Sequence, residues 1–189
     1  MNVVKQLRDE TGVAVMQCKK ALEETGGDLE KAKVILRKIS AQAAAKKADR
    51  VLGAGAIQAY VHSNNTVAAI VALACETDFV ARNPDFVKLA YDIAMHVAAM
   101  APQFITRESV SDADVVAAKA VFEEEAAGKP AEMREKIVAG KVDSYLKEKV
   151  LLEQTFVKDG SHTIKQLIEE AVQKFGEKVE VVRAERVAL

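Results

Sequence analysis

Residues 76–83 (ETDFVARN) follow directly on the most apolar run of the chain, residues 67–75, and run into a helix start at residues 83–85 (NPD). An acid and an aromatic, Asp78 and Phe79, therefore lie side by side where a buried strand turns into a helix. Such a corner can fill the core, with Phe79 folded back beneath the helix that follows, or it can project. We interpret it as a projecting corner that presents Asp78 and Phe79 to a partner.

The segments around this corner predict a rigid mount. Alternation over residues 56–62 and a turn at residues 63–65 (SNN) indicate that the apolar run is the second strand of a β-hairpin. Ile70 and its neighbour Val71 would point to opposite faces, so we expect this strand to be covered on both. Asn83 would then cap a long amphipathic helix, and Pro84 would occupy the first turn, where a missing N–H is harmless.

The N-terminal part predicts a small helical domain. Residues 3–39 read as three short helices separated by glycine turns, and an alanine-rich segment from Ser40 to Arg50 reads as a solvated helical linker. Alanine favours the helix but buries little surface. We therefore place a domain boundary between residues 1–50 and residues 51–189.

The C-terminal part adds the remaining elements of a core domain. We expect a helical hairpin over residues 111–127 and 131–146, and a strand over residues 150–156. A helix capped by Thr163 and a last strand over residues 179–187 follow. The predicted fold class is α+β: a three-helix domain followed by an antiparallel sheet with helices on one face and a helical hairpin. A second copy of the chain is one way to cover the other face.

Composition limits the function. Of the 189 residues, 27 are basic and 28 acidic, although residues 1–50 carry 11 basic and 7 acidic residues and the rest carry 16 and 21. This balance favours an ordinary globular protein with two distinct surfaces. The N-terminus has no signal-like apolar segment and no run reaches membrane-spanning length, so we expect a cytoplasmic protein, or the mature form of an organelle protein, without membrane contact.

A catalytic or metal site is not predicted. The three histidines, His62, His96 and His162, lack metal-ligand spacing. We interpret His96 as a satisfied structural residue and His162 as a solvated turn residue. Cys75 is expected to be a core residue, and Cys18 lies too far away in sequence to suggest a disulfide framework. We therefore expect no enzymatic activity, no cofactor and no metal.

The charged residues suggest two weaker possibilities, acid–base chemistry and nucleic-acid binding. Glu76 and Asp78 could face the same way at strand spacing, but no pocket or cofactor signal supports acid–base chemistry by them. Basic residues at positions 19–20 and 46–50 could contact nucleic acid, yet the basic segment has no stacking aromatic. We expect solvated helix faces and no direct nucleic-acid binding.

Two long motifs resemble those of one known family. Residues 7–22 (LRDETGVAVMQCKKAL) are similar to the N-terminal signature of elongation factor Ts, and residues 75–83 (CETDFVARN) are similar to its second signature. Residues 94–99, 154–158 and 174–177 resemble further family segments in the same order. The resemblance covers essentially the whole chain and is to the compact members, which carry one core unit.

The resemblance implies a guanine nucleotide exchange factor for elongation factor Tu. By position, the resemblance implies that the N-terminal helices bind the GTPase, a role that we call the grip. It further implies that the second motif inserts beside the Mg²⁺ ion of the bound nucleotide. It also implies contacts from a histidine at a strand end and from a glycine corner near the C-terminus. The implied partner-binding residues are Arg8, Val15, Met16, Lys19, His62, Thr77, Asp78, Phe79, Val80, Phe175 and Gly176.

The chain departs from the family pattern in two places. Val15 stands where the family commonly has methionine, and the last strand is smaller and more charged than usual. Compact members are expected to dimerise through their cores, so the second departure bears on dimer strength. One alternative is a non-catalytic adaptor, with a ubiquitin-associated-like helical module and an oligomerising core. Another is an RNA-binding translation accessory with steeply salt-dependent affinity.

Overall fold

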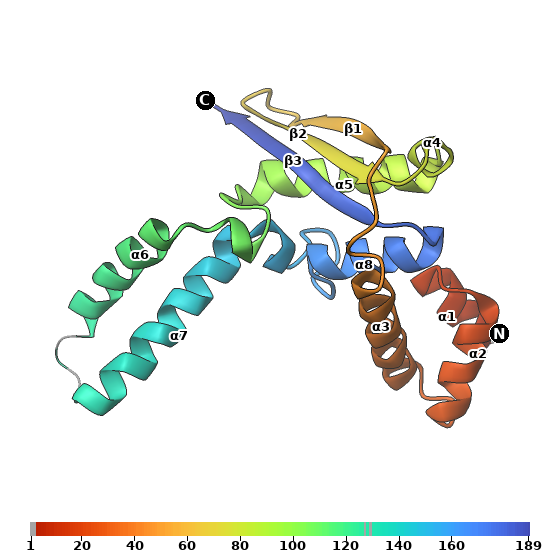
Figure 1. Cartoon of the computed structure of the whole chain (residues 1–189), viewed down its shortest axis with the longest axis horizontal. Coiled ribbons are helices and arrows are strands. Elements are labelled where there is room, and N and C mark those ends of the chain that lie inside the picture. Colours follow the sequence, from red (N-terminus) through yellow and green to blue (C-terminus); the bar gives the residue numbers. More distant parts are fainter. Residues whose placement is uncertain (1–2, 127, 129) are drawn as a thin grey trace.

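The computed structural model describes residues 3–126, 128 and 130–189. Its helices, strands and two single-turn 3-10 helices (η1 and η2) follow one another along the chain (Figure 1). They are α1 (Val3–Thr11), α2 (Val15–Glu24), α3 (Leu29–Ala45), β1 (Ala54–Val61), β2 (Val67–Cys75), α4 (Asp78–Ala81), α5 (Pro84–Met100), η1 (Arg107–Ser109), α6 (Asp112–Glu125), α7 (Ala131–Lys149), η2 (Leu151–Glu153), α8 (Ile164–Phe175) and β3 (Val179–Ala188). The predicted α+β class is confirmed.

Helices α1–α3 pack around a small hydrophobic cluster of their own. Gly12 ends α1 in the left-handed region, at φ +66°, which a residue with a Cβ atom adopts only with strain. Asp28 caps α3 by accepting a hydrogen bond from the backbone N–H of Lys31. The buried members of this cluster are Leu7, Val13, Cys18, Ala21, Leu22, Ala32 and Leu36. The division into residues 1–50 and 51–189 stays a prediction, with which this separate cluster agrees.

The alanine-rich segment differs from the solvated helix that we expected. Helix α3 ends at Ala45, and residues 46–49 form a turn. Ser40 is only 1% exposed, and Ala44 packs against the main core. Because α3 lies against α8, its C-terminal half is an interface between the helical part and the sheet part of the chain.

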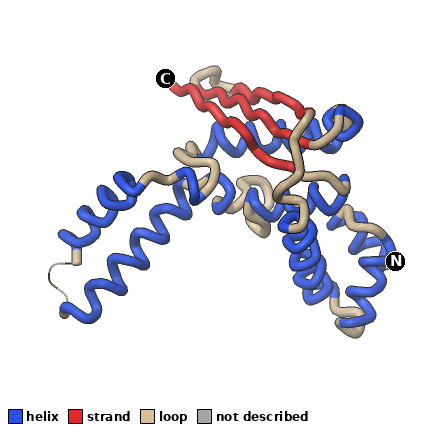
Figure 2. The backbone as a smooth tube through the Cα atoms, viewed as in Figure 1, coloured by secondary structure: helices blue, strands red, loops and turns tan. Residues whose placement is uncertain are grey.

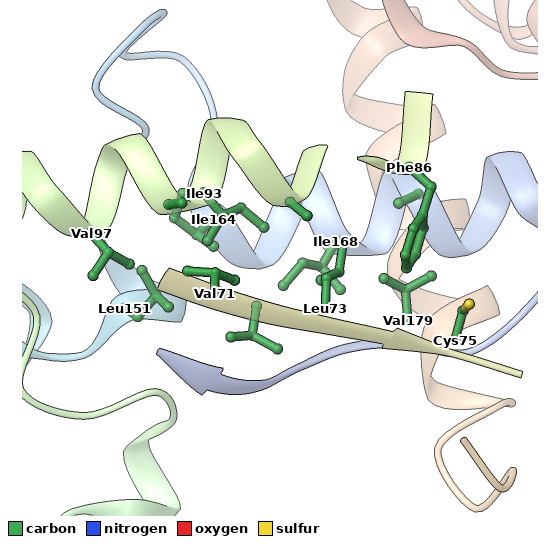
Figure 3. Close-up of a cluster of buried hydrophobic side chains, with 14 of the residues drawn as sticks. Val71, Leu73, Cys75, Phe86, Ile93, Val97, Leu151, Ile164, Ile168 and Val179 are labelled. Atoms are coloured by element: carbon green, nitrogen blue, oxygen red, sulfur yellow. The ribbon is translucent and has the colours of Figure 1, made fainter. Parts of the chain in front are cut away.

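The main core lies between a three-stranded antiparallel sheet and two helices. The strand order is β1-β2-β3, with β2 in the centre. Helices α5 and α8 cover one face, where side chains from Val71 and Leu73 meet Ile93 and Ile168 (Figure 3). Gly55 of β1 permits a close crossing, since a Cβ atom there would lie 2.5 Å from the carbonyl oxygen of Leu73.

None of the described helices covers the other face of the sheet (Figure 2). Ile70 is 51% exposed, although we expected β2 to be covered on both faces. It lies between Ala59 of β1 and Glu185 of β3 in the sheet register. The pattern of apolar residues on both faces was therefore identified correctly, but only the face with Val71 is covered by the chain's own helices.

The helical hairpin of α6 and α7 projects from the core on the side opposite to α1–α3 (Figure 1). Ser111 caps α6, and its hydroxyl accepts a hydrogen bond from the backbone N–H of Asp114. The predicted end of this helix, Ala127, lies outside the described residues. Arg107 joins the base of the hairpin to the core, because its guanidinium contacts both Asp143 of α7 and Glu153.

Residues 150–156 do not form the strand that we predicted. Leu151–Glu153 is a single 3-10 turn, and Val150 and Thr155 each make only an isolated β-bridge. The apolar residues in this segment are buried because they fill space beneath α5, with Leu151 fully buried. A short apolar run was mistaken for a strand because burial alone produces the same pattern.

Helix α8 begins with a capping box that can be tested. The Thr163 hydroxyl accepts from the N–H of Gln166 at 3.2 Å, and the Gln166 side chain accepts from the N–H of Thr163 at 2.8 Å. We expect Thr163→Ala to lower the free energy of unfolding by about 1 kcal/mol. Urea denaturation would measure this loss. Thr163→Ser should keep most of the cap, and an equal loss in both variants would contradict this role.

Candidate functional site

The corner between β2 and α5 carries an exposed aromatic ring. Thr77 caps the one-turn helix α4, and its hydroxyl accepts from the backbone N–H of Val80. Phe79 is 81% exposed, so it projects and does not fold back into the core. Val80 and Ala81 are buried beneath it and anchor the turn. The projecting interpretation of this corner is therefore correct for Phe79. We call residues 77–80 the tip.

Asp78 lies at the start of α4 and not at the end of the strand. Its carboxylate pairs with Arg82 at 3.1 Å across one helical turn, and both side chains are largely exposed. Glu76 and Asp78 do not lie at strand spacing, a possibility that the sequence left open, because β2 ends at Cys75 and the chain has already turned into α4 at Asp78. An acid in the first turn of a helix interacts favourably with the helix dipole, and because this carboxylate is exposed it stays available to a partner.

A carboxylate from the far end of the chain holds the tip in place. Glu177 accepts hydrogen bonds from the backbone N–H of Glu76 at 3.1 Å, from the backbone N–H of Thr77 at 3.0 Å, and from the Thr77 hydroxyl at 2.6 Å. Three donors on one carboxylate fix both the position and the direction of the chain as it enters α4. Glu177 was not among the predicted site residues.

Glu76 completes the attachment from the other side. Its carboxylate accepts from the backbone N–H of Lys178 at 2.6 Å and from Arg50 at 3.1 Å. The Lys178 N–H and the Arg50 guanidinium hold the pKa of Glu76 below its usual value. The two carboxylates thus cross-link adjacent chain segments, each accepting from the backbone of the other's segment.

Cys75 lies beneath this attachment as an inert thiol. Burial raises its pKa, and the negative charge of Glu177 raises it further. The thiol donates to the carbonyl oxygen of Thr77 at 3.2 Å. A protonated, buried sulfur that is already engaged with the backbone is a poor nucleophile. The prediction of a core residue at this position agrees with its complete burial.

The glycine corner after α8 lies next to the tip. Gly176 ends α8 at φ +73°, and the chain then turns into Glu177. Phe175 is half-buried, and its ring meets Phe86 edge-on at 5.9 Å between centroids. The structure therefore brings Phe175 and Gly176 together with Thr77 through the Glu177 hydrogen bonds. These two segments are about 100 residues apart in the sequence, so local sequence patterns could not show that they meet.

The predicted grip residues form an exposed surface on the first two helices. Met16 is 73% exposed, and Val15, Lys19 and Arg8 are exposed as well. Val15 and Lys19 lie one turn apart on α2, whose buried side carries Cys18 and Ala21. Because these four side chains are exposed, they are accessible to a partner. Lys19 reaches Glu23 at 3.8 Å, a surface pair that contributes little and leaves the ammonium available.

One lysine connects this surface to the base of the tip. The Lys174 ammonium pairs with Asp85, the second residue of α5, at 2.8 Å. Its stem passes Gly12, whose missing Cβ would otherwise lie 3.5 Å from the lysine Cδ. This ion pair lowers the pKa of Asp85. The turn between α1 and α2 is thereby held close to the start of α5.

His62 is not part of this assembly. It follows the last residue of β1, whereas Ala54 at the first end of β1 pairs with Cys75 beside the tip. Eight strand residues separate the two ends by about 25 Å. His62 contacts the Tyr60 hydroxyl through Nδ1 at 3.0 Å. It is exposed and could meet a partner only at a second, distant place.

The other two histidines have different surroundings from each other. His96 is fully buried: its Nδ1 accepts from the N–H of Val157 and its Nε2–H donates to Gln154, so burial lowers its pKa and both nitrogens are satisfied. The structural interpretation of His96 is confirmed. His162 contacts Arg37, Asp159 and Ser161, so the interpretation as a solvated turn residue is wrong.

Within the described ranges, no group of histidine, cysteine and acidic side chains could hold a metal ion. None of the described helices is both long enough and apolar enough to cross a membrane. The site thus consists of an exposed ring and acid on a fixed corner, together with an exposed helical surface. Such an arrangement can insert into a partner and hold it.

Comparison with known proteins gives a consistent match over the whole length. The model of a family described as "Elongation factor TS" matches residues 3–189. An elongation factor Ts from Coprothermobacter proteolyticus is 48% identical over 184 residues, covering 96% of this chain and 93% of that protein. One from Herpetosiphon aurantiacus is also 48% identical, covering 98% and 95%. One from Thermotoga neapolitana is 44% identical, covering 98% and 94%. This chain belongs to the elongation factor Ts family.

Proposed function

We propose that the tip of this chain opens the nucleotide site of elongation factor Tu while the α1–α2 surface holds the GTPase. As a member of the elongation factor Ts family, the chain is a guanine nucleotide exchange factor in translation elongation. It makes and breaks no covalent bond. The observation that supports the proposed role of the tip is the exposure of Phe79 on a corner fixed by the hydrogen bonds of Glu177.

The chemistry of GDP binding explains why such a tip would release it. Mg²⁺ requires nearly ideal octahedral geometry, and in such GTPases it is held by few protein groups, the phosphates and water. An inserted Phe79 ring can part the elements that flank this site. Asp78 can then draw donors and waters away from the phosphates. Each lost contact weakens GDP, and linkage requires that GDP weaken the exchange factor by the same factor.

The grip and the tip have separate tasks in this proposal. Arg8, Val15, Met16 and Lys19 would supply affinity that is the same for the loaded and the emptied GTPase. Thr77, Asp78, Phe79 and Val80, with Phe175 and Gly176 beside them, would supply contacts that form only as the nucleotide leaves. Only such differential contacts can shift the equilibrium toward release.

The direct test follows release of a fluorescent GDP analogue from elongation factor Tu on addition of micromolar chain. We expect a large acceleration that saturates with chain concentration. A chain that binds the GTPase without changing release would support the adaptor alternative instead. RNA binding that falls steeply with salt would support the RNA-binding alternative. A cytoplasmic location and the absence of direct nucleic-acid contact stay predictions.

The open face of the sheet suggests a homodimer through the core. Ile57 and Ile70 are exposed on this face, and Ile70 lies across from Glu185 in the register of β2 and β3. Arg183 and Glu185 pair with each other at 3.2 Å along β3, so the charged side chains lie on one edge of an otherwise apolar face. A second copy would remove this apolar surface from water.

Replacing the central apolar residue of this face should separate the copies. We expect Ile70→Asp to convert a dimer into a monomer, because an unpaired carboxylate would be buried at the interface. Sedimentation equilibrium would measure the mass. Val116→Asp on α6 introduces the same charge at a similarly exposed residue and should leave the mass unchanged. A wild-type chain that is monomeric at micromolar concentration would contradict the proposal.

A further inference from the structure

A third exposed side chain shares the outer face of this corner with Asp78 and Phe79. Arg82 directly follows α4, and its backbone N–H donates to the carbonyl oxygen of Asp78 at 3.1 Å, so the helical turn extends through it. Residues three and four apart on a helix lie on one face. The Arg82 side chain therefore lies on the face of Phe79 and Asp78, and it is 82% exposed. Val80 and Ala81 occupy the buried side of the same turn.

The ion pair of Arg82 with Asp78 keeps two opposite charges at the surface. The charged groups lie 3.1 Å apart, and both side chains are largely in water. Such a surface pair adds little to folding stability, because solvent screens it and two flexible side chains lose freedom in forming it. Exchanging this contact for one with a partner therefore costs little. In the free chain, the pair restricts where the guanidinium lies without burying it.

The chemistry of arginine limits what this group can meet in a partner. A guanidinium is always charged, only donates hydrogen bonds, and matches the geometry of a carboxylate or a phosphate. The nucleotide site of such GTPases offers both, in the phosphates of GDP and in an aspartate that helps to hold Mg²⁺. A guanidinium on the phosphates would strengthen GDP binding and oppose release. A guanidinium on the aspartate would stabilise only the state that has lost Mg²⁺.

We propose that Arg82 replaces the charge of Mg²⁺ in the emptied GTPase. The inference rests on the proposed function, in which Phe79 and Asp78 enter beside the nucleotide. Loss of Mg²⁺ leaves its aspartate ligand without a counter-charge in a site that is shielded from water, which is unfavourable. Arg82 turns from Asp78 to this aspartate and compensates it. Asp78 is then free to accept from donors that held the phosphates. Both contacts form only in the emptied state, as a shift toward release requires.

Competition with Mg²⁺ tests this assignment. Isothermal titration calorimetry would measure the affinity of the chain for nucleotide-free elongation factor Tu, with and without millimolar Mg²⁺. We expect Mg²⁺ to weaken wild-type binding about tenfold, because the ion and Arg82 compete for one carboxylate. Arg82→Gln should bind about tenfold more weakly than wild type without Mg²⁺, since it loses a charge-assisted hydrogen bond, and should respond little to the ion. Arg82→Lys keeps the charge and should retain part of both the affinity and the response.

A second exposed ion pair supplies the matched control. Lys119→Gln removes the cation of a pair with Glu123 on α6, at the same spacing of four residues, and should match wild type with and without Mg²⁺. All three variants should melt at the wild-type temperature, because surface substitutions of this kind change stability little. Equal responses to Mg²⁺ in wild type and Arg82→Gln would overturn the proposal.

Stimulated release separates this proposal from the proposed function. Arg82→Gln should slow GDP release from elongation factor Tu about tenfold relative to wild type. A variant that releases GDP faster than wild type would place the guanidinium on the phosphates and overturn the proposal. If wild type accelerated release and Arg82→Gln did so equally, the assignment of Arg82 alone would fail. If wild type accelerated no release, the proposed function would fail and this assignment with it.

Discussion

Phe79→Ala should slow stimulated GDP release by at least about 30-fold while leaving the folding stability nearly unchanged. A truncated aromatic anchor at an interface typically costs 2 kcal/mol or more, which corresponds to this factor. The ring is 81% exposed in the free chain, so its removal leaves no cavity. Surface truncations of this kind change the free energy of unfolding by about 0.5 kcal/mol or less. Stopped-flow release and urea denaturation would measure the two quantities in the same preparation.

Two comparisons make this result specific to the tip. Val116→Ala truncates another exposed apolar side chain, on the projecting helix α6, and should leave release at the wild-type rate. Asp78→Ala should also slow release, without a change in melting temperature. A Phe79→Ala chain that releases GDP at the wild-type rate would contradict the insertion mechanism. A loss of 3–5 kcal/mol in stability would instead indicate a core role for the ring.

Much of this corner follows from local rules that can be applied to sequence. The apolar run of β2, the Asn83 cap and Pro84 in the first turn of α5 each obey neighbour-level preferences, and the structure has all three. The α+β fold class could be predicted from the same local patterns. The one-turn helix α4 was not expected, although Thr77 precedes Asp78 as a capping residue would. A four-residue helix has too little periodicity to be recognised in a pattern.

The missed features depend on contacts between distant segments. Glu177 lies 100 residues from Thr77, and its only local signal was its place after the glycine that ends α8. Asp159 and Ser161 lie next to His162 in the sequence, but Arg37 comes from α3, 125 residues away, so the sequence could not distinguish a packed turn histidine from a solvated one. The open sheet face follows the same logic, since periodicity identifies an apolar face but cannot identify what covers it.

Glu177→Ala should slow maximal GDP release about tenfold with a smaller effect on affinity for elongation factor Tu. The substitution removes the acceptor of two backbone N–H groups and of the Thr77 hydroxyl. Hydrogen bonds to a charged group contribute about 1.5–3 kcal/mol each in favourable settings, and here part of that holds the tip in one orientation. Glu180→Ala is the matched control, because it removes an exposed carboxylate three residues later. Among the described residues, Glu180 forms an ion pair with Lys178 at the surface, so its removal should have little effect on release.

Because Glu177 orients the tip that carries Phe79, we expect the effect of Glu177→Ala on GDP release to depend on the Phe79 ring. In a double-mutant cycle, Glu177→Ala should cost about tenfold in release when Phe79 is present and much less when Phe79 is alanine, because a tip without its ring gains little from being held still. Glu177→Gln should lie between wild type and Glu177→Ala, since an amide oxygen can still accept from the backbone N–H groups. Additive losses from Glu177→Ala and Phe79→Ala would mean that Glu177 supports the core in general. Coupled losses would mean that a fixed corner, and not the exposed ring alone, produces exchange.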